Sequence, residues 1–196
     1  MAVMSQRLVI FDMDGTLTRP MLDFDAIRAE IGLPKEPLLE AVRALPPEDQ
    51  ARAEAILLRH EAVAAAGSEL QPGAKQTIDA IRRAGIPVAL MTRNTRLSTK
   101  AFDERHGLVF DHIRTREDGV MKPSPAPVLE ICRKFEAMPA DTWVIGDFHY
   151  DLMCGNAAGA ISVLFWGEGE PLPDWAREAR HVIQALPELL GLMGLV

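Results

Sequence analysis

The chain has 196 residues, of which 48% are hydrophobic and 25% are charged. That size and composition are typical of a globular protein that buries a real core, with one domain or with one domain and a small insert. The formal net charge of −7 argues against sequence-independent binding to nucleic acid or to an anionic membrane surface.

The N-terminal sequence and the cysteines predict a cytoplasmic protein. The apolar run that begins at Leu8 is too short for a secretion signal or a membrane span, and acidic residues follow it at once. Cys132 and Cys154 lack the paired spacing of a zinc site or a disulfide framework, so we expect two reduced thiols. No feature of the sequence indicates an obligate protein partner.

Short apolar segments alternate with helical patterns along most of the chain. The expected strands are 8–11, 86–91, a weaker 108–113, 143–145, 161–165 and a short edge strand near the C-terminus. The expected helices are 74–84, 97–106, 126–135, 152–158 and a last one after the edge strand. This alternation predicts an α/β fold with a Rossmann-like parallel sheet that helices cover on both faces.

The segment 19–72 interrupts the alternation because it contains helical patterns and no strand-like run. Its three helical patterns lie at 24–31, 38–45 and 47–67. Asp23 is a plausible N-cap for the first of these helices, and Gly32 is its stop. We interpret 19–72 as a small all-helical cap inserted into a discontinuous α/β core of residues 1–18 and 73–196. A helical crossover packed rigidly on the sheet is the alternative.

Two acidic residues, Asp12 and Asp14, follow the first apolar strand directly. In a parallel sheet, ligands bind at the carboxyl ends of the strands. Gly15 indicates that the chain already turns there, so the two carboxylates can aim at one point. A divalent cation or a shared proton relieves their repulsion, and both remedies suit phosphoryl transfer. The alternative is a turn in which an acid bonds only backbone amides.

Three later segments should reach the same edge of the sheet, because each follows a strand-like run. Thr92 is expected to begin a helix whose N-terminus favours an anion, and an ordinary N-cap is the alternative. Lys122 stands beside prolines that stiffen the backbone and make it a fixed charge. Asp147 ends a strand and Asp151 follows one helical turn later, so both could hold a divalent ion, or one could orient Lys122.

Together, these four segments closely resemble the motifs of the haloacid dehalogenase superfamily of hydrolases, and the resemblance covers nearly the whole chain. The matching residues are Asp12 and Asp14 in the first motif, Thr92 in the second, Lys122 in the third, and Asp147 with Asp151 in the fourth. The segment 19–72 looks like the small helical cap of phosphoglycolate-phosphatase-like members, although it is short for that group.

The resemblance implies a Mg²⁺-dependent phosphatase for a small phosphorylated metabolite. Asp12 would be the nucleophile that forms an aspartyl-phosphate, and Asp14 would be the general acid and then the general base. An acid at position 14 argues against cleavage of carbon–halogen or carbon–phosphorus bonds. A phosphosugar mutase of the β-phosphoglucomutase type and a non-catalytic phosphate-binding relic remain as alternatives.

The resemblance also implies how metal and phosphate would be held. The metal ligands would be the Asp12 carboxylate, the Asp14 backbone carbonyl and Asp147, while Thr92 and Lys122 would hold the phosphate. A further residue, Asp151, would support the metal or Lys122.

Other side chains have open roles. Arg93 is expected either to bind a second anionic group of the substrate or to form a surface ion pair, and His149 either faces the site or packs elsewhere. The candidates for contacts to the leaving group are Arg28, Arg43, Arg59 and His60.

Overall fold

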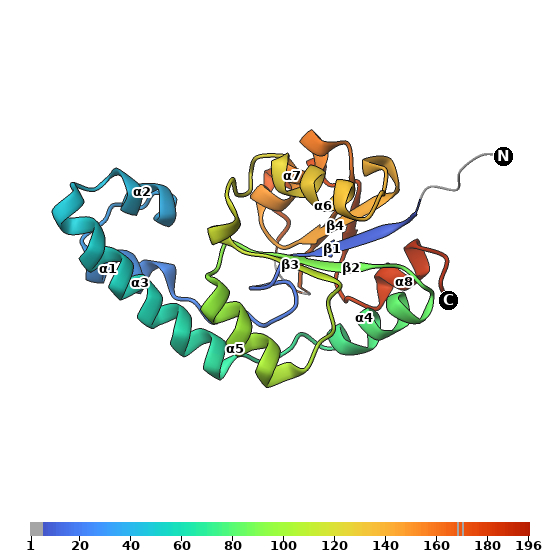
Figure 1. The fold of residues 1–196 in the computed structure, drawn as a ribbon, viewed down its shortest axis with the longest axis horizontal. Coiled ribbons are helices and arrows are strands. Elements are labelled where there is room, and N and C mark those ends of the chain that lie inside the picture. Colours follow the sequence, from blue (N-terminus) through green and yellow to red (C-terminus); the bar gives the residue numbers. More distant parts are fainter. Residues whose placement is uncertain (1–5, 168, 170) are drawn as a thin grey trace.

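The computed structural model describes residues 6–167, 169 and 171–196, and a six-stranded parallel sheet forms its centre (Figure 1). The strands are β1 (Leu8–Phe11), β2 (Val88–Met91), β3 (His112–Arg114), β4 (Thr142–Gly146), β5 (Ile161–Phe165) and β6 (His181–Ile183). They lie in the order β3-β2-β1-β4-β5-β6, so the first strand of the chain is central. The predicted α/β fold with a Rossmann-like parallel sheet is confirmed.

Helices cover both faces of the sheet, which explains why its strands are almost continuously apolar. The covering helices are α4 (Ala74–Arg83), α5 (Arg96–His106), α6 (Ala126–Lys134), α7 (His149–Ala158) and α8 (Glu188–Leu192), joined by the short 3₁₀ helices η1 (Arg116–Asp118), η2 (Pro139–Asp141) and η3 (Asp174–Glu178). Figure 1 shows α4, α5 and α8 on one face and α6 and α7 on the other. Side chains of β1 alternate between these layers: Val9 and Phe11 join the first, Leu8 and Ile10 the second.

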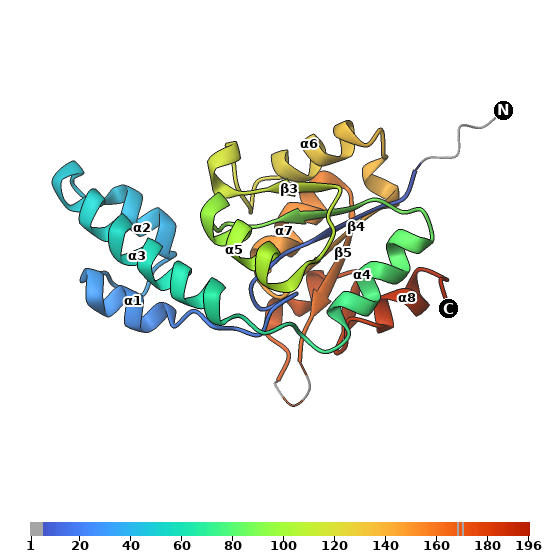
Figure 2. The same ribbon diagram turned by 60° about the horizontal axis from the view of Figure 1, so that its bottom comes forward.

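Between β1 and α4, three helices extend beyond the carboxyl ends of the strands (Figures 1 and 2). They are α1 (Phe24–Ile31), α2 (Leu38–Ala44) and α3 (Pro47–Gly67). Asp23 caps α1 as expected, because its Oδ1 accepts a hydrogen bond from the Ala26 N–H at 2.9 Å. A small apolar cluster that includes Ile27, Val42 and Leu57 holds the three helices together. We call residues 19–72 the helical insert.

The two ends of the helical insert run side by side. The Arg19 N–H donates to the Glu69 carbonyl, and the Gln71 N–H donates to the Leu17 carbonyl, each at 2.8 Å. An isolated antiparallel bridge between Thr18 and Leu70 lies between these two bonds. We call residues 17–19 and 69–71 the stalk, because this paired segment joins the insert to the sheet.

Two predicted elements begin at residues that differ from the structure by three or more positions. The weaker strand was expected at 108–113, but the ladder begins only at His112, because Leu108 packs into the core while its backbone still belongs to the connection from α5. The helix expected at 152–158 begins three residues earlier, at His149, and this places Asp151 in its first turn.

No helix in the described part of the chain is long and apolar enough to cross a membrane. Residues 1–5, part of the segment on which the prediction about a secretion signal rests, lie outside the described residues.

Candidate active site

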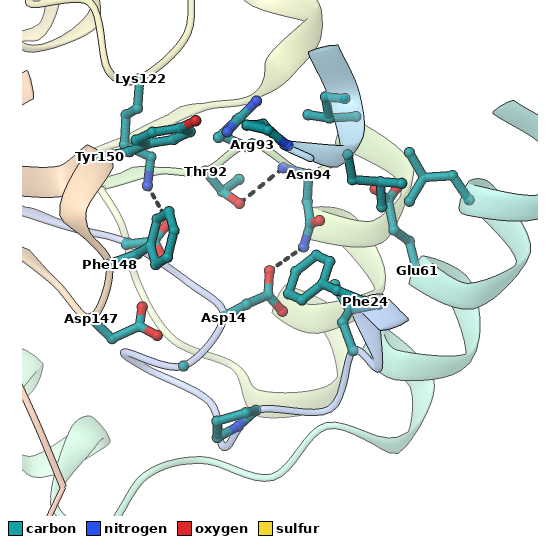
Figure 3. A pocket seen from close by; sticks show the side chains of 18 of the residues that line it. Asp14, Phe24, Glu61, Thr92, Arg93, Asn94, Lys122, Asp147, Phe148 and Tyr150 are labelled. Atoms are coloured by element: carbon teal, nitrogen blue, oxygen red, sulfur yellow. Dashed lines mark hydrogen bonds and ion pairs between the residues drawn. The ribbon is translucent and has the colours of Figure 1, made fainter. Parts of the chain in front are cut away.

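A cavity of about 470 Å³ lies between the carboxyl ends of the central strands and the helical insert (Figure 3). It brings together the residues that the sequence singled out from four separate segments. Those that line it are Asp12, Asp14, Thr92, Arg93, Lys122, Asp147 and Asp151. The expectation that these segments reach one edge of the sheet is therefore met by their positions.

Asp12 is fixed at the end of β1 by its backbone and by Lys122. Its N–H donates to the Ile145 carbonyl at 2.9 Å, and its Oδ1 accepts a hydrogen bond from Lys122 Nζ at 2.6 Å. The same Nζ donates to Asp151 Oδ1 at 2.7 Å. Burial lowers the pKa of Lys122, but the charges of Asp12 and Asp151 outweigh that effect and raise it. The ammonium group is therefore a permanent positive charge between two buried carboxylates.

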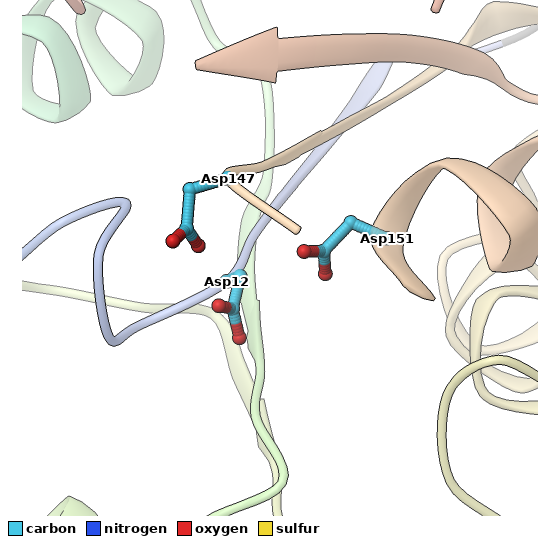
Figure 4. Close-up of side chains that lie close together, drawn as sticks. All are labelled: Asp12, Asp147 and Asp151. Carbon is cyan, nitrogen blue, oxygen red and sulfur yellow. The ribbon is translucent and has the colours of Figure 1, made fainter. Parts of the chain in front are cut away.

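Asp12, Asp147 and Asp151 form a tight group of carboxylates (Figure 4), and one oxygen of each lies within 4.8 Å of the others. Asp147 accepts a hydrogen bond from the Thr16 hydroxyl at 3.0 Å. Its pKa is raised well above its usual value, first by burial and then by the charges of Asp12 and Asp151. Hard oxygen donors with uncompensated negative charge suit a divalent cation such as Mg²⁺, so this donor set fits a metal site.

Gly15 allows Asp147 to approach the loop after β1. Its φ is +78°, and a Cβ built there would lie 2.0 Å from Asp147 Oδ2. We therefore expect Gly15→Ala to lower the free energy of unfolding by about 1–2 kcal/mol through backbone strain alone, and to displace the carboxylate. Urea denaturation measures the loss of stability, and the increase in stability that Mg²⁺ gives measures the displacement of the carboxylate.

Gly191→Ala is the control for this prediction, because Gly191 lies in α8, where a Cβ meets nothing within 4 Å. A Gly15→Ala variant as stable as that control, with Mg²⁺ binding intact, would contradict the proposed steric role of Gly15.

Asp14 is held by a side chain from the loop after β2, because its Oδ2 accepts a hydrogen bond from the Asn94 side-chain amide (Figure 3). Burial raises the pKa of Asp14 to about 7, with help from the charges of Asp12 and Glu61, while the Asn94 bond acts in the opposite direction. A carboxyl with that pKa exchanges a proton readily near neutral pH, as a general acid and base must.

Thr92 is buried at the end of β2, but it does not begin a helix as expected. The helix α5 begins at Arg96, and Thr95 caps it by accepting a hydrogen bond from the Ser98 N–H at 3.1 Å. The chain turns at 93–94 before the helix starts, because Thr92 Oγ1 accepts the Asn94 N–H at 3.1 Å. A hydroxyl can accept and donate at once, so this bond leaves the Thr92 O–H able to donate to a ligand.

Arg93 has features of both expected roles, which are binding an anionic group of the substrate and forming an ion pair. It lines the cavity, and its guanidinium pairs with Glu40 of α2 and lies 5.0 Å from the ring centroid of Tyr150. Its buried Nε has no hydrogen-bond partner among the described residues. This ion pair is partly exposed, with side-chain exposed fractions of 22% for Arg93 and 45% for Glu40, and it joins the helical insert to the core.

Of the basic residues proposed for the leaving group, Arg28 is among the described residues that line the cavity; Arg43, Arg59 and His60 are not. Arg59 and His60 instead pair with Glu30 of α1. His149 packs on Trp175 in a stacked arrangement with 5.1 Å between ring centroids, and its Nε2 lies 2.9 Å from Glu178 Oε2.

Sequence reasoning assigned no role to three residues of this site. Thr16 and Asn94 lie within two residues of motif residues, so their positions after strands were a usable signal. Glu61 lies in the middle of α3, and only the packing of that helix against the core brings it to the cavity.

Comparison with known proteins adds independent findings. The family model for haloacid dehalogenase-like hydrolases matches residues 6–159. A haloacid dehalogenase-like hydrolase domain-containing protein of Arabidopsis thaliana is 31% identical over an alignment of 181 positions, which covers 86% of this chain and 74% of that protein. A phosphoglycolate phosphatase of Vibrio vulnificus is 26% identical over an alignment of 218 positions, gaps included, which covers 95% of this chain and 96% of that protein. The crystal structure of a hydrolase from Pseudomonas syringae has a TM-score of 0.81 at 19% identity, with 97% and 99% coverage, and shows the same fold.

Proposed function

Because the chain belongs to the haloacid dehalogenase-like hydrolases and is an enzyme of the phosphatase type, we propose that it hydrolyses a small phosphorylated metabolite with the aid of Mg²⁺, through an aspartyl-phosphate intermediate. The observation that carries this proposal is the position of Asp12. Its carboxylate lies in the cavity, bound to Lys122 and next to Asp14, whose pKa of about 7 suits proton transfer.

In the first step, Asp12 attacks phosphorus and the bond between phosphorus and the leaving oxygen breaks, while Asp14 gives its proton to that oxygen. In the second step, Asp14 takes a proton from water as the water attacks the aspartyl-phosphate. Phosphate leaves and the Asp12 carboxylate is restored. Asn94 holds the Asp14 carboxyl in place between the two steps through its side-chain hydrogen bond.

The phosphate is anionic, so positive charge and hydrogen-bond donors must face it. Lys122 and the Thr92 hydroxyl supply these, and Arg93 adds positive charge at the cavity wall. Asp151 keeps Lys122 in position through the 2.7 Å hydrogen bond.

Asp12, the backbone carbonyl of Asp14 and Asp147 would hold the Mg²⁺, with Asp151 in support. Bound there, the ion would offset the negative charge of the carboxylates and polarise the phosphate. Thr16 orients Asp147 through its hydroxyl.

Residues 19–72 act in this proposal as a cap over a core of residues 1–18 and 73–196, contacting the leaving group and excluding water from the cavity. The substrate is a small-molecule phosphate ester, and the protein is cytoplasmic. The buried, unpaired thiols of Cys132 and Cys154 agree with a reducing compartment.

The test is hydrolysis of p-nitrophenyl phosphate by the purified protein. We expect release of free phosphate with Mg²⁺ and almost none with excess EDTA, and a higher thermal unfolding midpoint with Mg²⁺, because the ion binds the folded state. A rate that is the same in EDTA would overturn the metal-dependent mechanism. Isomerised sugar phosphate in place of free phosphate, when a bisphosphate primer is supplied, would indicate a mutase.

A further inference from the structure

Glu61 is a buried acid of α3 that no step of the proposed reaction uses. Its exposed fraction is 4%, although it lines the cavity (Figure 3). Its Oε1 forms an ion pair with Arg116 of the core. Its Oε2 is fully buried and accepts no hydrogen bond from any residue that the structure describes.

A buried carboxylate oxygen without a donor destabilises the folded state by about 1–3 kcal/mol. The side chain that carries this oxygen lines a ligand cavity, so a ligand bound there can supply the missing donor. The part of the cavity wall that the helical insert supplies is mostly apolar and includes Met21, Leu22, Phe24 and Leu57. The apolar wall favours a ligand with an apolar body, and Glu61 favours a ligand that carries one polar group at a matching position.

The chemistry of that polar group follows from the charges around Glu61. Arg116 already balances its negative charge, so Oε2 does not require a second cation. A carboxylate on the ligand would place another acceptor against Oε2 and could not donate the missing hydrogen bond. A neutral O–H donor is therefore the group that fits.

We propose that Glu61 Oε2 accepts a hydrogen bond from a hydroxyl group of the substrate's leaving alcohol. The preferred substrates are then phosphate monoesters of alcohols with a mainly apolar body and a second, free hydroxyl. This inference rests on the proposed phosphatase function and narrows its substrate class.

The experiment compares monophosphates of α,ω-diols with three to six carbons against n-alkyl phosphates of the same lengths, and against ω-carboxyalkyl phosphates. The value of kcat/KM is measured for each by release of free phosphate in Mg²⁺, with p-nitrophenyl phosphate as the general substrate. At the best length, we expect the diol monophosphate to exceed the alkyl phosphate by roughly 10- to 100-fold, the usual effect of a hydrogen bond to a charged group. The carboxyalkyl ester should be poorer than the alkyl ester.

Glu61→Gln is the informative variant. Arg116 keeps the amide oxygen in the position of Oε1, so the amide NH₂ replaces Oε2 and a donor stands where an acceptor was. The ratio of diol to alkyl ester should fall to about 1, and the carboxyalkyl ester should gain relative to the alkyl ester. We compare the ratio of the two kcat/KM values because the charge of Glu61 also raises the pKa of Asp14. A change in that pKa would affect the hydrolysis of both esters alike.

Glu54→Gln, an exposed change on the same helix, should keep the wild-type ratio. An enzyme that hydrolyses p-nitrophenyl phosphate without preferring the diol ester at any length would overturn the inference and leave the phosphatase proposal standing. A diol preference that survives in Glu61→Gln would also overturn it. No hydrolysis of any ester would overturn the phosphatase function itself. The wild-type comparison decides the question even if the variant folds poorly.

Discussion

Replacing Asp12 with asparagine is expected to reduce kcat at least about 10⁴-fold, as removal of a catalytic nucleophile does in other hydrolases. An amide cannot attack phosphorus, so no covalent intermediate forms. Its carbonyl oxygen can still accept the hydrogen bond that Lys122 donates to Asp12, so the fold should persist. Phosphate release in Mg²⁺ measures the loss, and the thermal unfolding midpoint reports the fold.

Asp79→Asn is the matched control for Asp12→Asn, because Asp79 lies on α4 with a side chain that is 40% exposed and pairs only with Lys75 among the described residues. It should leave kcat within about twofold, as surface changes do. If Asp12→Asn kept more than about a hundredth of the wild-type kcat, another residue would be the nucleophile.

Lys122→Met is expected to impair both stability and activity. Removing one partner from a buried ion pair typically lowers the free energy of unfolding by about 3–5 kcal/mol, because the remaining charge is left uncompensated. Here two carboxylates, Asp12 and Asp151, lose the same partner. The lost contact to phosphate should also lower kcat/KM by about 10²- to 10³-fold. Urea denaturation without metal and phosphate release in Mg²⁺ measure the two losses.

The destabilisation by Lys122→Met should depend on pH in a definite direction. Burial already raises the pKa of Asp151 to about 6, against the opposing effect of Lys122, and loss of Lys122 raises it further. An acid with a raised pKa in the folded state binds more protons there than in the unfolded chain, so folding becomes more favourable as pH falls. The stability difference from wild type should therefore shrink from pH 8 to pH 5. Lys134→Met, an exposed change at the end of α6, should show neither effect.

Much of the fold followed from local pattern. The strand β1 was found with its observed bounds because its four residues are apolar and are buried by helices on both faces. The helix α1 was found through Asp23 and Gly32, whose capping roles depend only on their neighbours. The segment around β3 was placed poorly because Leu108 is buried for a tertiary reason, which an apolar pattern does not separate from strand pairing.

The residues of the candidate site also divide into those that local sequence pattern predicts and those that tertiary packing brings to the site. Asp12 and Asp147 directly follow strands, so sheet topology brings them to one edge. Glu61 reaches the cavity because α3 packs against α5 of the core, and no spacing within α3 encodes that packing. The bond from Asn94 to Asp14 likewise depends on a turn that the sequence suggested was the start of a helix.

The stalk has a consequence for how this architecture tolerates change. Its two paired segments hold the ends of the 54-residue helical insert (residues 19–72) together through hydrogen bonds between backbone groups, which do not depend on the side chains between them. For a flexible loop whose ends are held in this way, each doubling of length raises the entropy of closure by only about 0.6 kcal/mol. The parts of the insert that do not contact the core could thus be lengthened, shortened or replaced with little effect on the sheet, so selectivity can diverge among descendants while the chemical machinery stays the same.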